Sequence, residues 1–95
     1  MVSTIWGDET KGPYGAMVKF PAGTQAPLHT HTSEVKMVVI KGAYIYTPEG
    51  GSKQRFGSGS YINYPAGDRH ETTTDADSES IVYMEQPGKF DLNVI

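Results

Sequence analysis

The stretch GTQAPLHTHTSEVKMVVIKG, residues 23–42, holds two of the chain's three histidines one residue apart. Its second half is a run of β-branched and other apolar residues, which favours a strand. Because side chains in a strand alternate between its two faces, His29 and His31 are expected to point the same way and to lie close enough to bind one ion. Taken alone, a His-x-His pair is equally well explained by two solvated or core histidines.

The third histidine, His70, directly follows the turn sequence YPAGDR at residues 64–69. A proline and a glycine there predict a tight reversal just before a new strand. The same tripeptide, Pro-Ala-Gly, precedes the first histidine pair at residues 21–23, which indicates reuse of one turn. A barrel would bring His70 beside the first two histidines.

The rest of the chain is divided into short pieces by eleven glycines and six prolines. The pieces are rich in Val, Ile, Tyr and Thr, lack a helical period and are too short for ordinary helices. We therefore expect an all-β, antiparallel sandwich or small barrel. The expected strands are residues 16–20, 29–40, 43–46, 60–64, 70–74 and 80–85.

Composition limits the classes of partner. A chain of 95 residues can build one hydrophobic core, and a net charge of -3 gives no basic field for nucleic acid or anionic lipid. Without cysteine, any metal must be held by nitrogen and oxygen. The N-terminus lacks the features of a signal peptide, and no apolar run is long enough to span a bilayer. We expect a cytoplasmic protein that binds neither nucleic acid nor membranes.

The spacing of the histidines and glycines resembles the two motifs of the cupin superfamily. The first motif, Gly-x5-His-x-His-x3–4-Glu-x6-Gly, matches residues 23–42, and the second, Gly-x5-Pro-x-Gly-x2-His-x3-Asn, matches residues 59–74. The resemblance implies one cupin domain over residues 1–95, with an antiparallel double-stranded β-helix or jelly-roll barrel. It also implies one divalent transition metal bound by all the histidines that the chain possesses: His29, His31 and His70.

Both ends of the chain extend the resemblance. The segments IWGDETKGPYGAMVKFPAG (residues 5–23) and YMEQPGKFD (residues 83–91) are similar to small single-domain cupins of undefined activity, in which a Trp-Gly-Asp start and a Gly-Lys-Phe-Asp end recur. This similarity supplies no substrate.

Two positions depart from the motifs. Val35 stands where the metal-binding glutamate belongs, and Thr74 stands where asparagine is usual. Glu34 lies one position before Val35, so strict alternation turns its side chain away from the histidines. A β-bulge would be needed to bring Glu34 to the metal, and a solvated strand carboxylate is the simpler interpretation.

Three neutral imidazoles suit Zn, Fe, Ni, Mn or Cu, with Zn or Fe favoured, and suit hard Mg or Ca poorly. Three protein ligands leave positions open, as in catalytic sites. One hypothesis is therefore an enzyme acting on a small, anionic or carbonyl-bearing molecule, either a dioxygenase, since some cupin dioxygenases use three histidines and iron, or a metal-assisted hydrolase, isomerase or lyase. The alternative is a non-catalytic ligand-binding or sensing module.

Two further groups of side chains are candidates for the ligand cavity. Apolar residues that share the histidines' face by alternation are expected to line it or, on the simpler interpretation, only to fill the core: Val35, Met37 and Val39. Cations that could hold an acidic ligand, although each alone is more simply a surface charge, are Lys19, Lys36 and Arg55.

The N-terminal segment STIWG predicts a homodimer. Ile5 and Trp6 have too few neighbours in sequence to form a core of their own, and an exposed indole beside isoleucine is an unusual apolar patch for a small monomer. Pairing this segment with a partner's sheet would cover an edge strand and bury the indole. The alternative is that Trp6 folds back over its own barrel.

Overall fold

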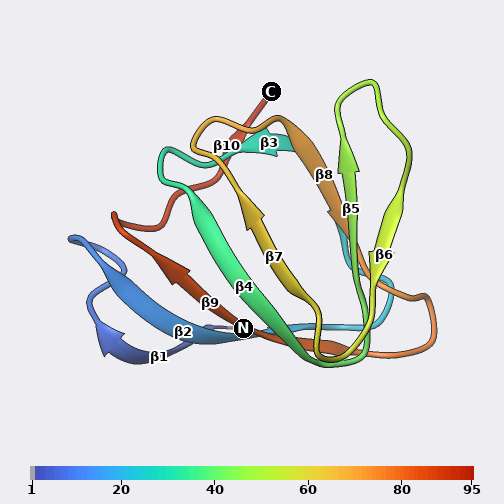
Figure 1. Ribbon diagram of the computed structural model, residues 1–95, viewed down its shortest axis with the longest axis horizontal. Coiled ribbons are helices and arrows are strands. Elements are labelled where there is room, and N and C mark those ends of the chain that lie inside the picture. The colour runs from blue at the N-terminus through green and yellow to red at the C-terminus, as the bar shows by residue number, and fades with distance from the viewer. Residues whose placement is uncertain (1) are drawn as a thin grey trace.

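The computed structural model describes residues 2–95, and it consists of two five-stranded antiparallel sheets that face each other (Figure 1). The prediction of an all-β fold is confirmed, and the arrangement is that of a jelly roll whose sheets are not closed into a continuous barrel. No helix long and apolar enough to cross a membrane occurs in the described range. In the first sheet the order of neighbouring strands is β1 (Val2–Gly7), β2 (Tyr14–Phe20), β9 (Ser80–Gln86), β4 (Val35–Lys41) and β7 (Tyr61–Tyr64). In the second sheet the order is β10 (Asn93–Val94), β3 (Gln25–Thr30), β8 (His70–Thr73), β5 (Tyr44–Pro48) and β6 (Gln54–Phe56).

The glycines of both motifs are required by the backbone. Gly23, Gly42, Gly59 and Gly67 have φ values of 71°, 73°, 87° and 77°, a region that L side chains rarely adopt. The two Pro-Ala-Gly turns are closed in the same way, by the amides of Thr24 and Asp68, which donate to the prolines' carbonyl oxygens, each at 3.2 Å. A glycine with positive φ at the third position is typical of a type II turn, so the repeated tripeptide is one turn used twice.

The prediction of one strand over residues 29–40 is wrong. β3 ends at Thr30 and β4 begins at Val35, and the residues between them carry the chain from one sheet to the other. Polar Thr32 and Ser33 form the bend at this crossing. The sequence pattern also missed β1, β6 and β10, which are short or exposed strands without a buried face.

The core lies between the two sheets. Alternate side chains of β4 point inward, so that Val35, Met37 and Val39 are at most 1 % exposed. β9 contributes Val82 and Met84 to the same cluster. The simpler interpretation, that the three β4 residues fill the core, is therefore confirmed.

The N-terminal strand β1 lies at the edge of its sheet and pairs with β2 of the same chain. The Trp6 indole N–H donates to the Tyr83 hydroxyl at 2.8 Å, and the ring lies over Gly15, where a Cβ would come within 2.1 Å of the indole nitrogen. Trp6 nevertheless stays 45 % exposed and Ile5 60 % exposed. The segment thus folds back on its own sheet and leaves an apolar surface, and the homodimer stays a prediction.

Candidate metal centre

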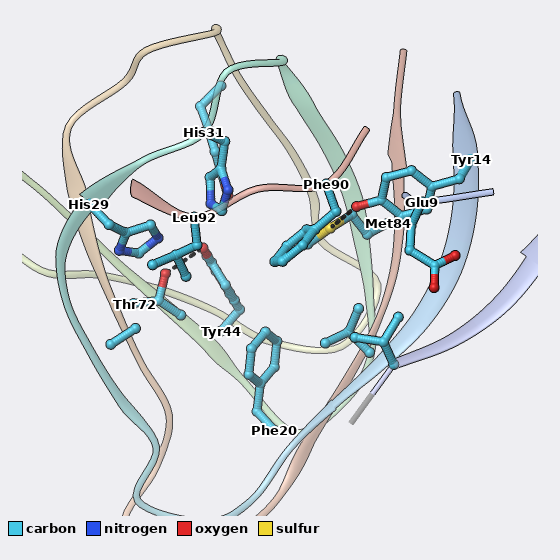
Figure 2. Close-up of a pocket in the computed structure, with 14 residues that line it drawn as sticks. Glu9, Tyr14, Phe20, His29, His31, Tyr44, Thr72, Met84, Phe90 and Leu92 are labelled. Atoms are coloured by element: carbon cyan, nitrogen blue, oxygen red, sulfur yellow. Dashed lines mark hydrogen bonds between the residues drawn. The ribbon is translucent and has the colours of Figure 1, made fainter. Parts of the chain in front are cut away.

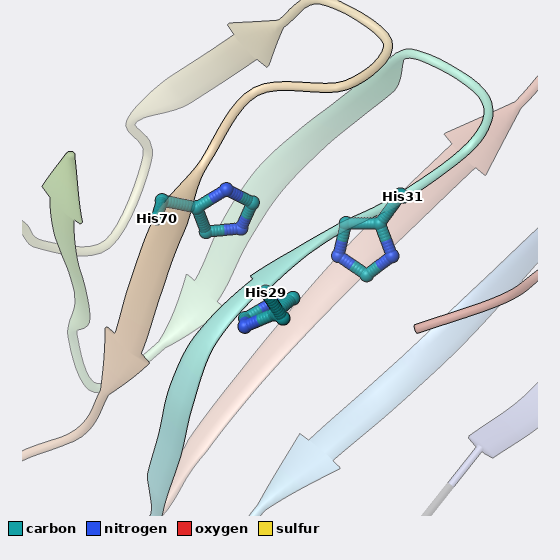
Figure 3. A group of neighbouring side chains, drawn as sticks. All are labelled: His29, His31 and His70. Carbon is teal, nitrogen blue, oxygen red and sulfur yellow. The ribbon is translucent and has the colours of Figure 1, made fainter. Parts of the chain in front are cut away.

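The fold brings the three histidines together. His29 lies near the end of β3, His31 is the first residue after that strand, and His70 begins β8 (Figure 3). The ring centroids are 4.4 Å apart for His29 and His70, 4.9 Å for His29 and His31, and 5.6 Å for His31 and His70. Each residue offers one nitrogen such that these atoms all lie within 4.8 Å of one another, and all three side chains are buried.

A β-bulge sets the register of His29. Along β3 and β8, Ala26 pairs with Thr72 and His29 pairs with His70, so β3 carries one extra residue between the two pairs. Pro27 lies in this bulge, where the missing N–H of proline costs no ladder hydrogen bond. The bulge therefore places His29 directly opposite His70.

Backbone carbonyls orient all three rings. The Nδ1 atom of His29 is 2.6 Å from the Pro27 oxygen, that of His70 is 3.1 Å from the Asp68 oxygen, and that of His31 contacts the Asp91 oxygen. A carbonyl can only accept, so the proton of each neutral ring belongs on Nδ1 and the lone pair on Nε2.

The Nε2 atom of His70 is buried and has no hydrogen-bond partner. Because a buried polar atom without a partner is costly, a bound cation would supply what this nitrogen lacks. The donor set is three neutral nitrogens without a carboxylate, which fits a divalent transition metal. The residues present therefore fit such an ion.

A carboxylate lies behind His70. The Asp68 Oδ2 atom is 3.3 Å from His70 Nδ1, and the same oxygen accepts a hydrogen bond from the Tyr46 hydroxyl. Carboxylates in this position hold the ring of a metal-binding histidine in place and increase its basicity. Asp68 was not predicted from the sequence, although its place in the second motif, two residues before the histidine, was a usable signal.

The C-terminal segment covers His31. In addition to the Asp91 carbonyl, the Asp91 carboxylate accepts a hydrogen bond of 2.8 Å from the Thr32 amide, and the Phe90 ring centroid is 5.9 Å from that of His31. β10 then pairs with β3, with Val94 opposite His29. Phe90 and Asp91, in the segment that resembles the end of small cupins, thus have a physical role that was not predicted from the sequence.

Burial affects the protonation of the histidines. It is the largest cause that lowers the pKa of His70, to about 4, with a further contribution from His29. Burial, partly offset by the Asp91 carbonyl, also lowers the pKa of His31. Both rings are therefore neutral at pH 7, which is the form that binds a metal.

The motif position at which cupins carry a metal-binding glutamate is occupied here by an apolar side chain. Val35 is fully buried, while Glu34 lines a groove on the outside of the sheet together with Trp6 and Lys36. Among residues 2–95, the group of potential metal ligands around the histidines contains no carboxylate. Thr74, at the motif's asparagine position, is used structurally: its hydroxyl donates to the Pro21 oxygen at 3.0 Å.

A cavity of about 410 Å³ opens beside His29 and His31 (Figure 2). Its walls are mainly apolar, with Phe20, Met84 and Phe90 among the lining residues. The expectation that Val35, Met37 and Val39 line it is wrong, because these side chains are packed in the core. The three candidate cations do not line it either: Lys19 pairs with Glu79, Arg55 pairs with Asp75, and Lys36 faces the outer surface.

Tyrosines form the wall nearest the histidines. The Tyr64 ring centroid is 4.5 Å from that of His70, and the Tyr44 hydroxyl shares a 2.9 Å hydrogen bond with Thr72. Burial is the largest cause that raises the pKa of both phenols. They are therefore neutral at pH 7 and act as hydrogen-bonding groups rather than as phenolate bases.

Comparison of the sequence with protein families gives one match. A family model described as a domain of unknown function, DUF4437, matches residues 2–93. No curated protein sequence matches the chain.

Solved structures with similar folds include proteins described as cupins or cupin-like. A cupin-like protein from Thermotoga maritima is 19 % identical, with a TM-score of 0.78 over 99 % of this chain and 77 % of that one. A protein of unknown function with a cupin-like fold from Ralstonia eutropha is 27 % identical, with a TM-score of 0.74 over 97 % and 63 %. The DMSP lyase DddQ from Ruegeria pomeroyi is 24 % identical, with a TM-score of 0.77 over 93 % of this chain, which spans 46 % of the lyase. The cupin fold expected from the two motifs is confirmed.

Proposed function

The chain belongs to the DUF4437 family, and we propose that this member is a metal-binding cupin that holds one divalent transition metal through His29, His31 and His70. The observation that carries the proposal is the cluster itself: three buried imidazoles with nitrogens within 4.8 Å of one another, and an unpartnered Nε2 on His70. Neutral nitrogen ligands favour zinc or iron, with nickel, manganese and copper as further candidates.

We propose that the site acts on a small molecule. His29, His31 and His70 would hold the metal with fewer ligands than a closed structural site, and the metal would supply a Lewis acid that polarises an oxygen or acidifies a water molecule. The apolar wall excludes water and holds the rest of the molecule, and the Tyr44–Thr72 pair offers hydrogen bonds to its polar atoms. This description covers a dioxygenase and a metal-assisted hydrolase, isomerase or lyase.

One observation favours the second candidate, a binding or sensing module without turnover. Two hydroxyls in or near the cavity that could transfer protons are already engaged: Tyr44 with Thr72, and Tyr46 with the Asp68 carboxylate. A general acid or base must be free to exchange its proton with the reacting molecule. If these bonds persist with a ligand present, the site binds without catalysing.

The test starts from protein purified without added metal. Mass spectrometry of its metal content is followed by screens for oxygen uptake and for ester hydrolysis. Iron with oxygen uptake supports the dioxygenase, zinc with hydrolysis supports metal-assisted chemistry, and a stoichiometric metal without turnover supports the binding module. Protein that contains no transition metal and takes up none from solution contradicts the proposal.

We also propose the setting in which the site works. Residues 1–95 form one cupin domain, whose acidic net charge of -3 disfavours nucleic acid and anionic membranes as partners. The exposed Ile5 and Trp6 on edge strand β1 support a homodimer. We propose the cytoplasm as its location. The tests for the dimer are given in the Discussion.

A further inference from the structure

The end of the cavity remote from the histidines has a distinct chemistry. Glu9 and Tyr14 lie together there, with Phe90 and Met84 between them and the histidines (Figure 2). Among the described residues that line the cavity, Glu9 is the one with a formal charge at pH 7, and no lysine or arginine is present. The cavity therefore has a cation-binding nitrogen cluster at one end and a carboxylate at the other.

Glu9 is held in place, and within residues 2–95 it forms no ion pair. Its carboxylate accepts a hydrogen bond from the Thr4 hydroxyl at 2.5 Å, and its backbone oxygen accepts the Phe90 amide at 2.8 Å. The ion pairs of the described chain lie elsewhere, on Glu79, Asp75, Glu49 and Asp68. The charge of Glu9 reaches the cavity wall, since burial first and Glu9 second raise the pKa of Tyr14 to about 12.

Aromatic rings also lie at this end. Tyr14 is next to Glu9, Phe90 lies between Glu9 and the histidines, and ring faces attract cations. A carboxylate next to aromatic rings favours a positive group and disfavours a negative one, and the partial burial of Glu9 leaves this charge interaction only partly screened by water.

We propose that Glu9 selects ligands by charge: the cavity takes a small molecule that carries a metal-binding oxygen group at one end and a positively charged group at the end facing Glu9. This inference rests on the proposed function, because the oxygen group needs the metal. The lining holds a carboxylate in place of lysine or arginine at this end, so we expect a second negative charge on the molecule to be repelled.

The experiment uses the full chain loaded with Co²⁺, whose visible spectrum reports binding of a carboxylate. Three four-carbon probes are titrated at pH 7.5: 4-aminobutyrate, butyrate and succinate, which differ only in the group at the far end. We expect 4-aminobutyrate to bind about tenfold more tightly than butyrate, and succinate to bind about tenfold more weakly, the scale of one partly screened charge interaction. Equal affinities, tighter binding of succinate, or no binding of any probe at millimolar concentration would overturn the inference.

A matched pair of variants assigns the effect to Glu9. Glu9→Gln, which can still accept the Thr4 hydroxyl, should bring the three affinities within about twofold of one another. Glu85→Gln, which removes a carboxylate from the outer face of β9, should keep the wild-type order. If Glu9→Gln does not fold, Glu9→Asp serves instead and should retain the order, and loss of the order would contradict the inference.

Failure of the two proposals is distinguishable. If the protein takes up no Co²⁺, the proposed function fails before any probe is added. If Co²⁺ binds and the probes bind without discrimination by charge, the metal site stands and the selection by Glu9 is wrong.

Discussion

His29 and His70 are Cα partners on the adjacent strands β3 and β8, and their ring centroids are 4.4 Å apart. A slip of one residue in this register would move one of the rings to the opposite face of the sheet. Two thirds of the histidine cluster therefore depends on a single strand pairing, and the β-bulge at Pro27 fixes that pairing. His31 joins them from the crossing between the sheets, where Asp91 orients its ring.

Asp68 supports the metal site through His70. Asp68→Asn removes the negative charge 3.3 Å from His70 Nδ1, so the ring becomes a weaker base and is less firmly oriented. We expect metal affinity to fall about tenfold or more, as is typical of such partners. Isothermal titration with Zn²⁺ measures the change. Glu71→Gln, which alters an exposed carboxylate on the same strand, is the control, and equal affinities for the two variants would contradict the prediction.

Val35 occupies the place of the motif's glutamate. It is fully buried and pairs with Tyr64, whose ring contacts His70. Val35→Glu buries an unpaired carboxylate, so metal-free protein should lose roughly 3 kcal/mol or more of its free energy of unfolding. Added Mn²⁺ or Fe²⁺ should restore stability, because oxygen ligands suit these ions. Urea denaturation with and without Mn²⁺ tests this.

Two control variants complete that experiment. Val35→Gln should be destabilised without rescue by Mn²⁺, because an amide is a much poorer ligand than a carboxylate. Glu34→Ala should keep wild-type metal occupancy, since Glu34 faces an outer groove. Loss of the metal from Glu34→Ala would mean that this carboxylate reaches the histidines in solution.

The stability of the metal-free protein should depend on pH through His70. Its pKa is about 4 when folded and near 6.5 when unfolded, so between these values the unfolded chain binds the proton more readily. The contribution is present in full above pH 6.5 and is lost as pH falls towards 4, by about 3 kcal/mol at most for this group. Urea midpoints in chelator from pH 7.5 to 4.5 measure it. His70→Gln should flatten the profile, and parallel wild-type and variant profiles would refute the assignment.

The spacing of glycines and histidines, through its resemblance to the two cupin motifs, predicted the fold and the cluster. All four motif glycines have positive φ, so their positions encode turns directly, and the turns determine which strands bring His29, His31 and His70 together. The break between β3 and β4 was not predictable from residue types alone. Thr32 and Ser33 are compatible with a strand, and the bend arises because the chain must cross between sheets.

The surroundings of the cluster were less accessible to sequence reasoning. Asp91 orients His31 from sixty residues away through a backbone carbonyl, which any residue type could supply. Glu9 reaches the cavity from a loop next to an edge strand, and nothing in its local sequence distinguishes it from a solvated carboxylate. Such contacts depend on how distant segments pack, and they leave no periodic signal.

From the exposed edge strand β1 we expect the protein to form a homodimer. Its six residues are exposed, and Ile5 and Trp6 form an apolar surface beside its unpaired backbone groups. Light scattering at micromolar concentration should give twice the 10.4 kDa mass of one chain. Trp6→Ala should shift the protein towards monomer, whereas Tyr61→Ala, which changes an exposed aromatic at the opposite edge of the sheet, should not. A monomeric wild type would disprove the dimer.

The central claim is that His29, His31 and His70 jointly bind one metal ion. The most direct measurement is the metal content, by mass spectrometry after gel filtration, of wild-type protein and of the His29→Ala, His31→Ala and His70→Ala variants, with circular dichroism to show that each is folded. We expect about one transition metal ion per wild-type chain and a similar, large loss of occupancy in each variant, because removing any one imidazole leaves only two ligands. Folded variants that all keep the wild-type metal content would contradict the account.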